Sequence, residues 1–320
     1  MEHSTQISDI GELREEDKLR ILLTGMTGNS GKSFLKSIKR YSAHLKYAHY
    51  RILVRSASRI GLIDQSGLGV EIACGDSKSD AFLDEAMKDV DTVFHVAGIR
   101  SSVNIVRAAI RQKVKWVVVV HTTGIYSKYK SASAEYKRIE QMVETLASDA
   151  RVPLTILRPA MIYGTISDGN IAVFIKMVDR LKIFPVVDHA EFSLQPVHFE
   201  DLAEAYCRVL MNEEITKGKS YNLSGKEPIL LMDIFRTIAR LLAKSPFFIS
   251  IPSPIAYLGA LLLYGISFKR IDFREKVQRL VEPRVFSHEA AARDFGYSPM
   301  SFEEGVVNEI ADYKALSRKR

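Results

Sequence analysis

Short aliphatic runs alternate along this chain with segments of helical periodicity, and this alternation restricts the possible folds more than any other feature. Such runs are typical of strands buried on both faces, and helices between them make consecutive strands parallel. We therefore predict an α/β fold, a doubly wound parallel sheet with a ligand crevice at the carboxyl ends of its strands. The predicted strands are 19–23, 50–54, 70–73, 92–96, 116–120 and 154–157, and the clearest helical segments are 101–112 and 132–146.

The stretch TGMTGNSG, from Thr24 to Gly31, follows the first predicted strand and precedes a helical pattern. Glycine tolerates positive φ and lets a ligand approach the backbone, while a helix start offers unpaired N–H groups and the positive end of its dipole. The spacing of Gly25, Gly28 and Gly31 therefore predicts a site for an anion, most simply a pyrophosphate. A glycine-rich connection without a ligand is the alternative, because glycine patterns alone produce false matches.

The composition of the chain indicates its domain organisation, its location and the kinds of ligand that it binds. The 320 residues are 47% hydrophobic, which is enough for one large domain and a smaller appendage. Cys74 and Cys207 form neither a disulfide framework nor a metal-ligand spacing, so we predict no metal site and a cytoplasmic location. The net charge of +7 is spread along the chain and suits anionic small molecules. The basic tail 317–320 is interpreted as solvated, and we predict no nucleic-acid partner.

The longest apolar run extends from Ile255 to Ile266. It is shorter than the roughly 18 to 20 residues that cross a bilayer, so we predict no transmembrane segment. We expect a buried helix that packs against the C-terminal part of the chain. The alternative is an interfacial helix, followed in the sequence by Lys269 and Arg270.

The T-G-x-x-G-x-x-G form of the glycine stretch resembles the extended and atypical short-chain dehydrogenase/reductases, which are similar to NAD-dependent epimerases and dehydratases. The resemblance covers residues 19–313 and implies a Rossmann core with a smaller C-terminal α/β substrate lobe. It implies a dinucleotide-binding core 19–165 and a lobe 166–316 with segments around 195–223 returning to the core. Outside these parts, the polar and charged residues 1–18 are predicted to form a flexible N-terminal arm, and residues 317–320 a basic tail. The further motifs of the resemblance are GD at 75–76, VDTVFHVAG at 90–98, LRPAMIYG at 157–164, QPVHFEDLAEAY at 195–206, YNLSG at 221–225 and FGYSPMSFEEGV at 295–306.

The same resemblance assigns cofactor roles to individual residues. Tight packing at strand ends is the alternative for Ala97, Gly98 and Pro159. His198 and Asp201 are interpreted as structural residues, and Asp201 is predicted to be a helix N-cap. The alternative for His198 is a role as an active-site acid. The implied cofactor residues are Gly25, Thr27, Gly28, Asn29, Ser30 and Gly31 around the pyrophosphate, Asp76 at the adenine, Ala97 and Gly98 at the nicotinamide-side ribose, and Pro159 and Ile162 at the nicotinamide.

The end of the second predicted strand indicates the form of the cofactor. An acidic residue there would bind the ribose hydroxyls of NAD, whereas arginine accommodates a 2′-phosphate. This chain has Arg55 and Ser56 at that place. Because arginine grips phosphate through a bidentate fork, NADP(H) is favoured, and a surface arginine with bound NAD is the alternative.

The residues at the expected catalytic positions, after the fifth predicted strand and on the next helix, depart from the family pattern. Members that transfer hydride carry a Ser or Thr after the fifth strand and a Tyr-x-x-x-Lys on the next helix, where the Lys lowers the pKa of the Tyr. Thr122 matches the hydroxyl position, but the helix lacks the Tyr-x-x-x-Lys pair. A literal Tyr126-x-x-x-Lys130 falls on the loop before the helix and is interpreted as accidental. We predict that Tyr129, on this shortened loop, takes the place of the missing tyrosine.

Two alignments of the helix are open. Counting from Glu140 places Tyr136 at the family's lysine, and counting from Arg158 places Lys137 there. Neither alignment leaves a tyrosine one turn earlier. The predicted catalytic set is Thr122, Tyr129 and Lys137.

Two functions from different classes follow. The first is an NADP-dependent epimerase, dehydratase or reductase that acts on a small molecule, such as a nucleotide sugar or a related hydroxy or keto compound. The second is a dinucleotide-binding sensor or regulator without turnover. The family motifs retained in the C-terminal half favour the enzyme, while the missing helix pair favours the sensor, and a fold alone does not decide between them. A homodimer is compatible with either.

Overall fold

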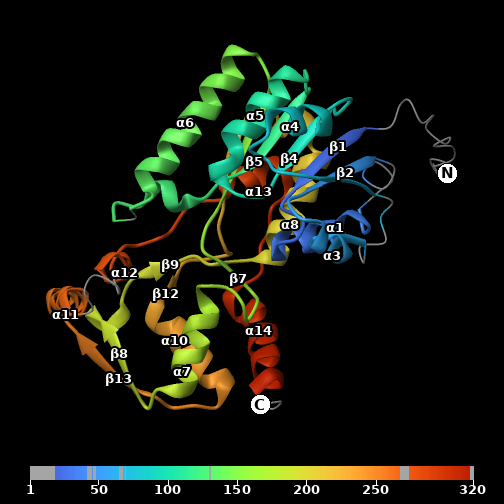
Figure 1. Cartoon of the computed structure of the whole chain (residues 1–320). Helices are drawn as coiled ribbons and strands as arrows, with labels where there is room; N and C mark the ends of the chain where they lie inside the picture. The colour runs from blue at the N-terminus through green and yellow to red at the C-terminus, as the bar shows by residue number, and fades with distance from the viewer. Residues whose placement is uncertain are drawn as a thin grey trace, which may run out of the picture.

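The computed structural model describes residues 19–41, 45, 48–64, 68, 70–129, 131–266 and 274–317. It confirms the predicted α/β fold, with a central sheet of seven parallel strands in the order β11–β6–β5–β4–β1–β2–β3 (Figure 1). The predicted arm 1–18 and residues 318–320 of the tail lie outside the described residues. The strands are β1 (Arg20–Thr24), β2 (His49–Val54), β3 (Val70–Cys74), β4 (Thr92–His95), β5 (Trp116–Val120), β6 (Leu154–Pro159) and β11 (Ser220–Leu223).

The strand order reverses between β1 and β4. The chain builds outward from β1 through β2 to β3, then returns to place β4 on the other side of β1. The connections that leave β1 and β4 run in opposite directions, so a crevice forms at the carboxyl ends of these two strands. The glycine stretch after β1 therefore lies at the point where such sheets bind ligands.

Helices cover both faces of the sheet because its strands are apolar on both faces. Along β1, Ile21 and Leu23 join the core on one face, and Leu22 joins the core on the other. The first face is covered by α1, α8 and α13, and the second by α4, α5 and α6 (Figure 1). The bounds of these helices are α1 (Asn29–Ile38), α4 (Asp80–Ala86), α5 (Ser102–Arg111), α6 (Ser133–Asp149), α8 (Phe199–Met211) and α13 (Glu289–Phe295).

A second lobe packs around its own aromatic core. Phe235 lies 4.7 Å from Phe184 and 5.1 Å from Phe174 between ring centroids. We use "second lobe" for α7 (Ile171–Arg180), β8 (Ile183–Val187), α10 (Leu231–Leu242), β13 (Phe247–Ile251), α11 (Ser253–Ile266), α12 (Arg274–Leu280) and α14 (Phe302–Ser317).

Shorter elements connect these parts. β8 pairs with β13 in parallel, and β7 pairs with β10 in parallel beneath the sheet. The shorter elements are β7 (Ile162–Tyr163), β9 (Ser193–Leu194), β10 (Val197–His198), β12 (Ile229–Leu230), α3 (Gly61–Asp64), α9 (Glu213–Thr216), and the 3₁₀ helices η2 (Ala57–Arg59), η3 (Ile99–Ser101), η4 (Thr123–Tyr126) and η5 (Asp188–Ala190).

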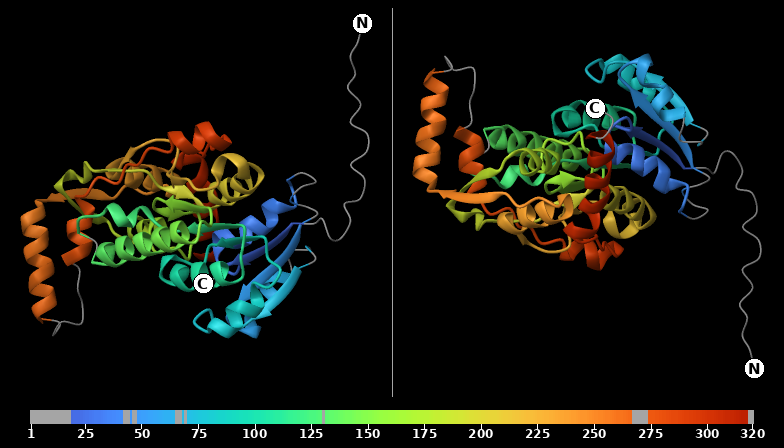
Figure 2. Two further views of the ribbon diagram at one scale, coloured as in Figure 1. Left: turned by 90° about the horizontal axis from the view of Figure 1, so that it is seen from above. Right: turned by 90° about the horizontal axis from the view of Figure 1, so that it is seen from below.

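The apolar run 255–266 forms most of α11, but the prediction that this helix is buried is wrong. Ala260 is only 7% exposed, whereas Leu258 is 54% exposed and Ile266 is 75% exposed. Figure 2 shows α11 in orange at the end of the molecule opposite β1 to β3. Within the described residues, no helix combines the length and the apolar character needed to cross a membrane.

The N-cap of α8 also differs from the prediction. His198, not Asp201, occupies the N-cap position, and its Nδ1 accepts a hydrogen bond from the Glu200 amide at 3.3 Å. The Asp201 carboxylate lies in the first turn and accepts a bond from the Met300 amide at 3.2 Å. Burial raises the pKa of Asp201 to about 7. The acidic residue therefore ties α8 to the segment before α14, and it also interacts with the backbone N–H of the N-cap residue His198.

Glu309 on α14 is fully buried and joins the second lobe to the end of β7. Its Oε2 accepts a hydrogen bond from the Gly164 amide at 3.0 Å. Burial, and then the charge of Asp168, raises the pKa of Glu309 to about 9. Because the folded pKa lies above the unfolded one, this group stabilises the fold at low pH, and that contribution is lost as the pH rises from about 4.5 to about 9.

Glu309→Gln is therefore expected to raise the melting temperature above that of the wild type at pH 8, with little difference at pH 4. The amide retains an oxygen for the Gly164 N–H and carries no charge to bury. Thermal unfolding by circular dichroism at both pH values measures the effect, with Glu303→Gln at a well-exposed position of α14 as the control. Parallel pH dependences for Glu309→Gln and the wild type would contradict this account.

Candidate functional site

The turn after β1 brings three backbone segments into close contact. Gly25 has φ of +82°, and a Cβ at this position would lie 2.6 Å from the Ala97 amide nitrogen. A Cβ on Gly31 would overlap the Gly25 carbonyl oxygen. α1 starts at Asn29 with Gly28 as an N-cap that has no side-chain hydrogen bond. The turn therefore requires glycine for packing and directs the N–H groups at the start of α1 toward the crevice.

A cavity of about 650 Å³ lies at this turn, and we call it the glycine-loop cavity. It is formed at the carboxyl ends of β1, β2 and β4. A volume of this size is typical of sites for small molecules and cofactors. The predicted cofactor residues that line it are Gly25, Thr27, Gly28, Ser30, Arg55, Ala97 and Gly98.

The other predicted cofactor residues do not line this cavity. Gly31 packs beneath the turn, and the Asn29 side chain donates a hydrogen bond to Thr165 Oγ1 at 2.9 Å. The Ser56 hydroxyl is bonded to that of Ser58 at 2.8 Å, and the Asp76 carboxylate accepts the Lys78 amide at 3.0 Å. Pro159 ends β6, and Ile162 lines a different cavity, described below.

The charges around the glycine-loop cavity are of one sign. Arg55, Arg59, Lys78 and Arg100 line it, and no carboxylate is found among its described lining residues. Arg100 is paired with Glu135 at 2.9 Å, so the match to a dinucleotide with an additional phosphate rests on Arg55, Arg59 and Lys78. Of the four, sequence reasoning found only Arg55. The other cations come from η2, from the loop after β3 and from η3, so no single sequence motif connects them.

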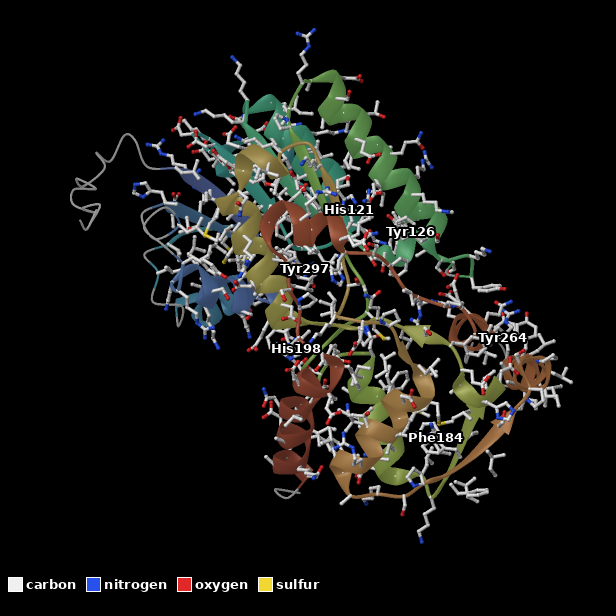
Figure 3. The ribbon with its side chains drawn as sticks, turned by 180° about the vertical axis from the view of Figure 1, so that it is seen from behind. His121, Tyr126, Phe184, His198, Tyr264 and Tyr297 are labelled. Atoms are coloured by element: carbon white, nitrogen blue, oxygen red, sulfur yellow. The ribbon has the colours of Figure 1, made fainter. Side chains whose placement is uncertain are left out.

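The catalytic candidate Thr122 lines a second cavity, of about 340 Å³, which we call the Thr122 cavity. This cavity is formed at the carboxyl ends of β5 and β6. Because β5 is the neighbour of β4 in the sheet, the cavity lies next to the glycine-loop cavity. Ile162 and Tyr126 also line it, and Figure 3 shows Tyr126 where the sheet meets the second lobe. The Tyr126 hydroxyl donates a hydrogen bond to Asn222 Oδ1 at 3.3 Å, and its ring lies 5.5 Å from that of Phe286.

The far wall of the Thr122 cavity carries two arginines that the sequence analysis did not identify, Arg279 and Arg284. Their Nε atoms are buried without a hydrogen-bond partner among the described residues. Burial, and then repulsion from Arg279, lowers the pKa of Arg284 to about 10. Glu282 also lines the cavity and partly offsets this repulsion, and an anionic group there would pair with both guanidinium groups.

Glu282 fixes the loop that follows Tyr126. Its carboxylate accepts hydrogen bonds from the Ser127 hydroxyl at 2.6 Å and from the Lys128 amide at 2.7 Å. Tyr129 follows this anchor, is 43% exposed, and lines neither cavity. The structure therefore brings Tyr126, rather than Tyr129, into the cavity that contains Thr122.

The helix α6 presents Tyr136 to the glycine-loop cavity. Glu140 is buried one turn later, and residues four apart share one face of a helix, so Tyr136 faces the sheet as Glu140 does. Lys137 lies about 100° further round the helix, is exposed, and lines neither cavity. The arrangement corresponds to the alignment that counts from Glu140, and Lys137 is not brought to Thr122.

A buried cluster supports the ends of β5 and β6. Glu140 accepts hydrogen bonds from Arg158 at 2.7 Å and from His121 Nδ1 at 2.8 Å, and His121 Nε2 lies 3.1 Å from the Ser102 hydroxyl. Arg158 and Glu140 are 11% and 9% exposed at their side chains. The cluster connects α5 and α6 to the strands just before Thr122.

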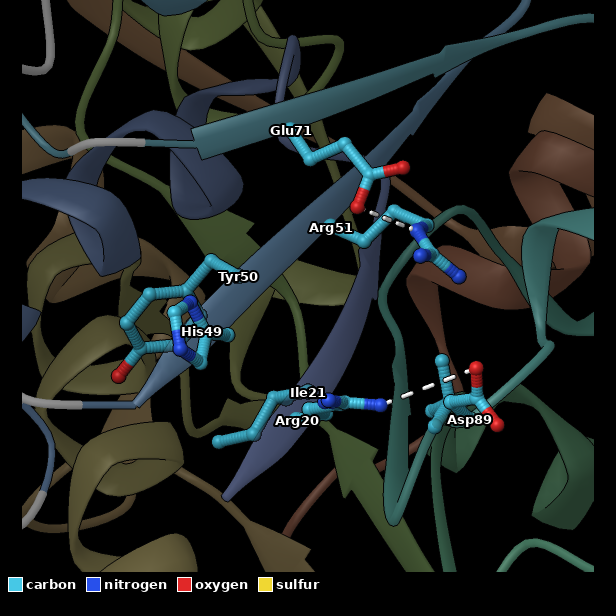
Figure 4. Close-up of a pocket in the computed structure, with 8 residues that line it drawn as sticks. Arg20, Ile21, His49, Tyr50, Arg51, Glu71 and Asp89 are labelled. Atoms are coloured by element: carbon cyan, nitrogen blue, oxygen red, sulfur yellow. Dashed lines mark ion pairs between the residues drawn. The ribbon is translucent and has the colours of Figure 1, made fainter. Parts of the chain in front are cut away.

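A third cavity, of about 360 Å³, lies at the amino ends of β1 and β2 (Figure 4). Its charged side chains pair with one another, with Arg20 3.8 Å from Asp89 and Arg51 2.9 Å from Glu71. Parallel sheets of this kind bind ligands at the opposite, carboxyl edge. We therefore place the candidate site at the first two cavities.

The chain is similar in sequence and in fold to known proteins. Residues 25–180 match a family model described as NAD(P)H-binding. The chain is 24% identical to 2-alkyl-3-oxoalkanoate reductase of Shewanella oneidensis, over 80% of this chain and 78% of the relative. It superposes on UDP-glucose 4-epimerase of Thermotoga maritima with a TM-score of 0.69 at 15% identity, over 93% of this chain and 99% of that one. An NADPH-dependent quinone oxidoreductase of Escherichia coli gives a TM-score of 0.68 at 16% identity, over 92% and 99%.

Proposed function

We propose that this chain, which carries a Rossmann-type NAD(P)H-binding domain, is an NADP(H)-dependent oxidoreductase or epimerase that transfers hydride reversibly between the cofactor and a hydroxy or keto compound. One observation carries the proposal. A cavity lined by four cations lies at the ends of β1, β2 and β4, and a second cavity with hydroxyl groups lies at the ends of β5 and β6. The first fits a dinucleotide phosphate, and the second fits the substrate.

The residues of the first cavity would hold the cofactor, which supplies or accepts the hydride when bound. The N–H groups after Gly28 would bind the pyrophosphate, and Arg55 with Arg59 would bind the 2′-phosphate. Tyr136 would contact the nicotinamide side, because it lies on α6 next to the ends of β4 and β5. NAD remains the alternative if these arginines do not engage a phosphate.

The residues of the second cavity would position the substrate oxygen. In reduction, the carbonyl carbon receives hydride and its oxygen receives a proton, so the site needs a hydroxyl that donates one. Tyr126 and Thr122 line the same cavity and supply two hydroxyl groups. We assign the proton donor to Tyr126 and the positioning hydrogen bond to Thr122.

Arg279 and Arg284 favour a substrate that carries an anionic group. The named relatives offer two such chemistries. One is the carboxylate of a 2-alkyl-3-oxoalkanoate, and the other is the diphosphate of a nucleotide sugar such as UDP-glucose. Both combine a carbonyl or hydroxyl group with a negative charge, which suits Thr122 and Tyr126 on one wall and the arginines on the other.

The cofactor assignment is tested by charge reversal at Arg55. Arg55→Glu is expected to weaken NADPH binding by about 1 to 3 kcal/mol and to spare NADH, because it removes a charge-assisted bond to the 2′-phosphate. Isothermal titration calorimetry with both cofactors measures the difference. Arg107→Glu, on the exposed side of α5, changes the net charge equally and should leave both affinities unchanged. Equal losses for NADPH and NADH would show that Arg55 does not bind the 2′-phosphate.

The second candidate function is a dinucleotide-binding sensor. The absence of a Tyr-x-x-x-Lys pair from the sequence of α6 favours it. NADPH oxidation assayed with 3-oxoalkanoates, nucleotide sugars and quinones separates the two functions. Turnover of any of these supports the enzyme, whereas tight NADPH binding without turnover across the whole set favours the sensor.

A further inference from the structure

An uncharged segment of 24 residues, 245–268, contains both β13 and α11. Within α11, Ile255 is 60% exposed, Leu258 54%, Leu262 58% and Ile266 75%. These positions follow the spacing i, i+3, i+7 and i+11, so their side chains form one continuous stripe along the helix. Ala260, on the opposite side, is 7% exposed and faces the protein. The helix therefore presents an aliphatic face that no described part of the chain covers.

The strands next to α11 continue this apolar surface. On β13, Phe247 is 69% exposed and Ile249 is 42% exposed, and Ile183 of β8, which pairs with Phe247, is 60% exposed. Phe248 alternates to the inner side and packs on Phe184, at 5.5 Å between ring centroids. One residue, Pro252, separates β13 from α11. Figure 2 shows both elements at the same end of the molecule.

The charges that flank the segment select its partner. Residues 269–276, which follow it in the sequence, contain four basic residues and two acidic ones. Arg274, at the start of α12, lies 4.0 Å from the centroid of the Tyr264 ring. An apolar stripe with tyrosine and a basic flank matches the boundary between acyl chains and anionic headgroups. A two-fold contact between two copies would instead bring the same basic flanks toward each other.

We propose that the exposed face of α11, with the outer face of β8 and β13, binds the surface of an anionic lipid bilayer. At about 1.5 Å per residue, the 14 residues of α11 span roughly 21 Å, which is less than a hydrocarbon core. The helix therefore lies in the plane of the headgroups and inserts its stripe partway. This binding is independent of the proposed catalytic function.

Sedimentation with lipid vesicles tests the proposal on the full chain. Wild-type protein is expected to bind vesicles of phosphatidylcholine and phosphatidylglycerol, and to bind phosphatidylcholine alone at least about tenfold more weakly because the basic flank lacks a counter-charge. Leu258→Ser/Leu262→Ser should reduce binding to the mixed vesicles by at least about tenfold, since two inserted side chains are lost. Val307→Ser/Leu316→Ser, at exposed positions of α14, is the matched control and should bind as the wild type does.

Each variant is first compared with the wild type by circular dichroism and thermal unfolding, so that a loss of vesicle binding is not a loss of fold. Wild-type protein that stays in the supernatant would overturn the proposal, as would equal binding by both double variants. A dimer in light scattering that Leu258→Ser/Leu262→Ser dissociates, without vesicle binding by the wild type, would assign the face to a second copy instead. Equal binding to the two lipid compositions would overturn the requirement for anionic headgroups.

Discussion

Tyr126→Phe is expected to lower NADPH-dependent turnover by roughly 10² to 10⁴-fold, because removal of a general acid or base has this effect. The ring would keep its contact with Phe286, and only the hydroxyl would be lost. Thr122→Val should lower turnover in the same direction, while Thr122→Ser retains a hydroxyl and should restore most of it. Steady-state kinetics, with whichever 3-oxoalkanoate, nucleotide sugar or quinone is turned over, measures the loss of chemistry. Calorimetry with NADPH shows whether cofactor binding is also lost.

Tyr129→Phe is the matched control, because Tyr129 lies three residues away with nearly the same exposure. Its turnover should equal that of the wild type if Tyr126 is the proton donor. If Tyr129→Phe loses activity and Tyr126→Phe retains it, the loop rearranges when substrate binds, and the tyrosine predicted from sequence is the catalytic one. Lys137→Met should leave turnover unchanged, since Lys137 is exposed and lines neither cavity.

Glu140→Ala is expected to lower the free energy of unfolding by about 3 to 5 kcal/mol, because removal of one member of a buried ion pair leaves an uncompensated charge. Arg158 and His121 would both lose their carboxylate partner. Urea unfolding at pH 7 measures the change. Glu144→Ala, one turn further along α6 and 51% exposed, should cost less than about 1 kcal/mol.

Glu140→Ala should also change how the free energy of unfolding depends on pH in the acidic range. Burial acts to raise the pKa of Glu140, but hydrogen bonds from His121 and Arg158 outweigh it, so its pKa lies below the usual value. A lowered folded pKa contributes stability above the unfolded pKa, which is lost as the pH falls through the folded one. The difference between wild type and Glu140→Ala should therefore narrow as the pH falls below about 4.5. A constant difference across this range would contradict the ion-pair account.

Local signals sufficed for the sheet and its turn. The runs that form the central strands β1, β4, β5 and β6 are largely apolar on both faces, so they could be identified without knowing their neighbours. The glycine turn was predictable because its three glycines, between a strand and a helical pattern, all lie within eight residues. The position of Arg55 at the glycine-loop cavity was predictable because this residue directly follows the strand β2.

The remaining site depends on contacts between distant residues. Arg279 and Arg284 reach the Thr122 cavity only because the chain returns from the second lobe, more than 150 residues after Thr122. Lys137 and Tyr136 differ by one residue in sequence, and the burial of Glu140 decides which of them faces the sheet. The exposure of α11 could not be predicted from its apolar composition, which is equally typical of a buried helix.

The seventh strand of the sheet has a consequence for synthesis of the protein. β11 joins the edge of β6 only after the chain has left the sheet and built α7, β8 and α8, and Tyr297 then donates a hydrogen bond to the Ser224 carbonyl at 2.9 Å. α8 also covers α1, through contacts such as that between Phe34 and Tyr206. A nascent chain that ends at residue 180 therefore holds the whole glycine turn, but it leaves α1 uncovered and β6 as an open edge. We expect such a chain to depend on chaperones until the ribosome has released the residues that close the core.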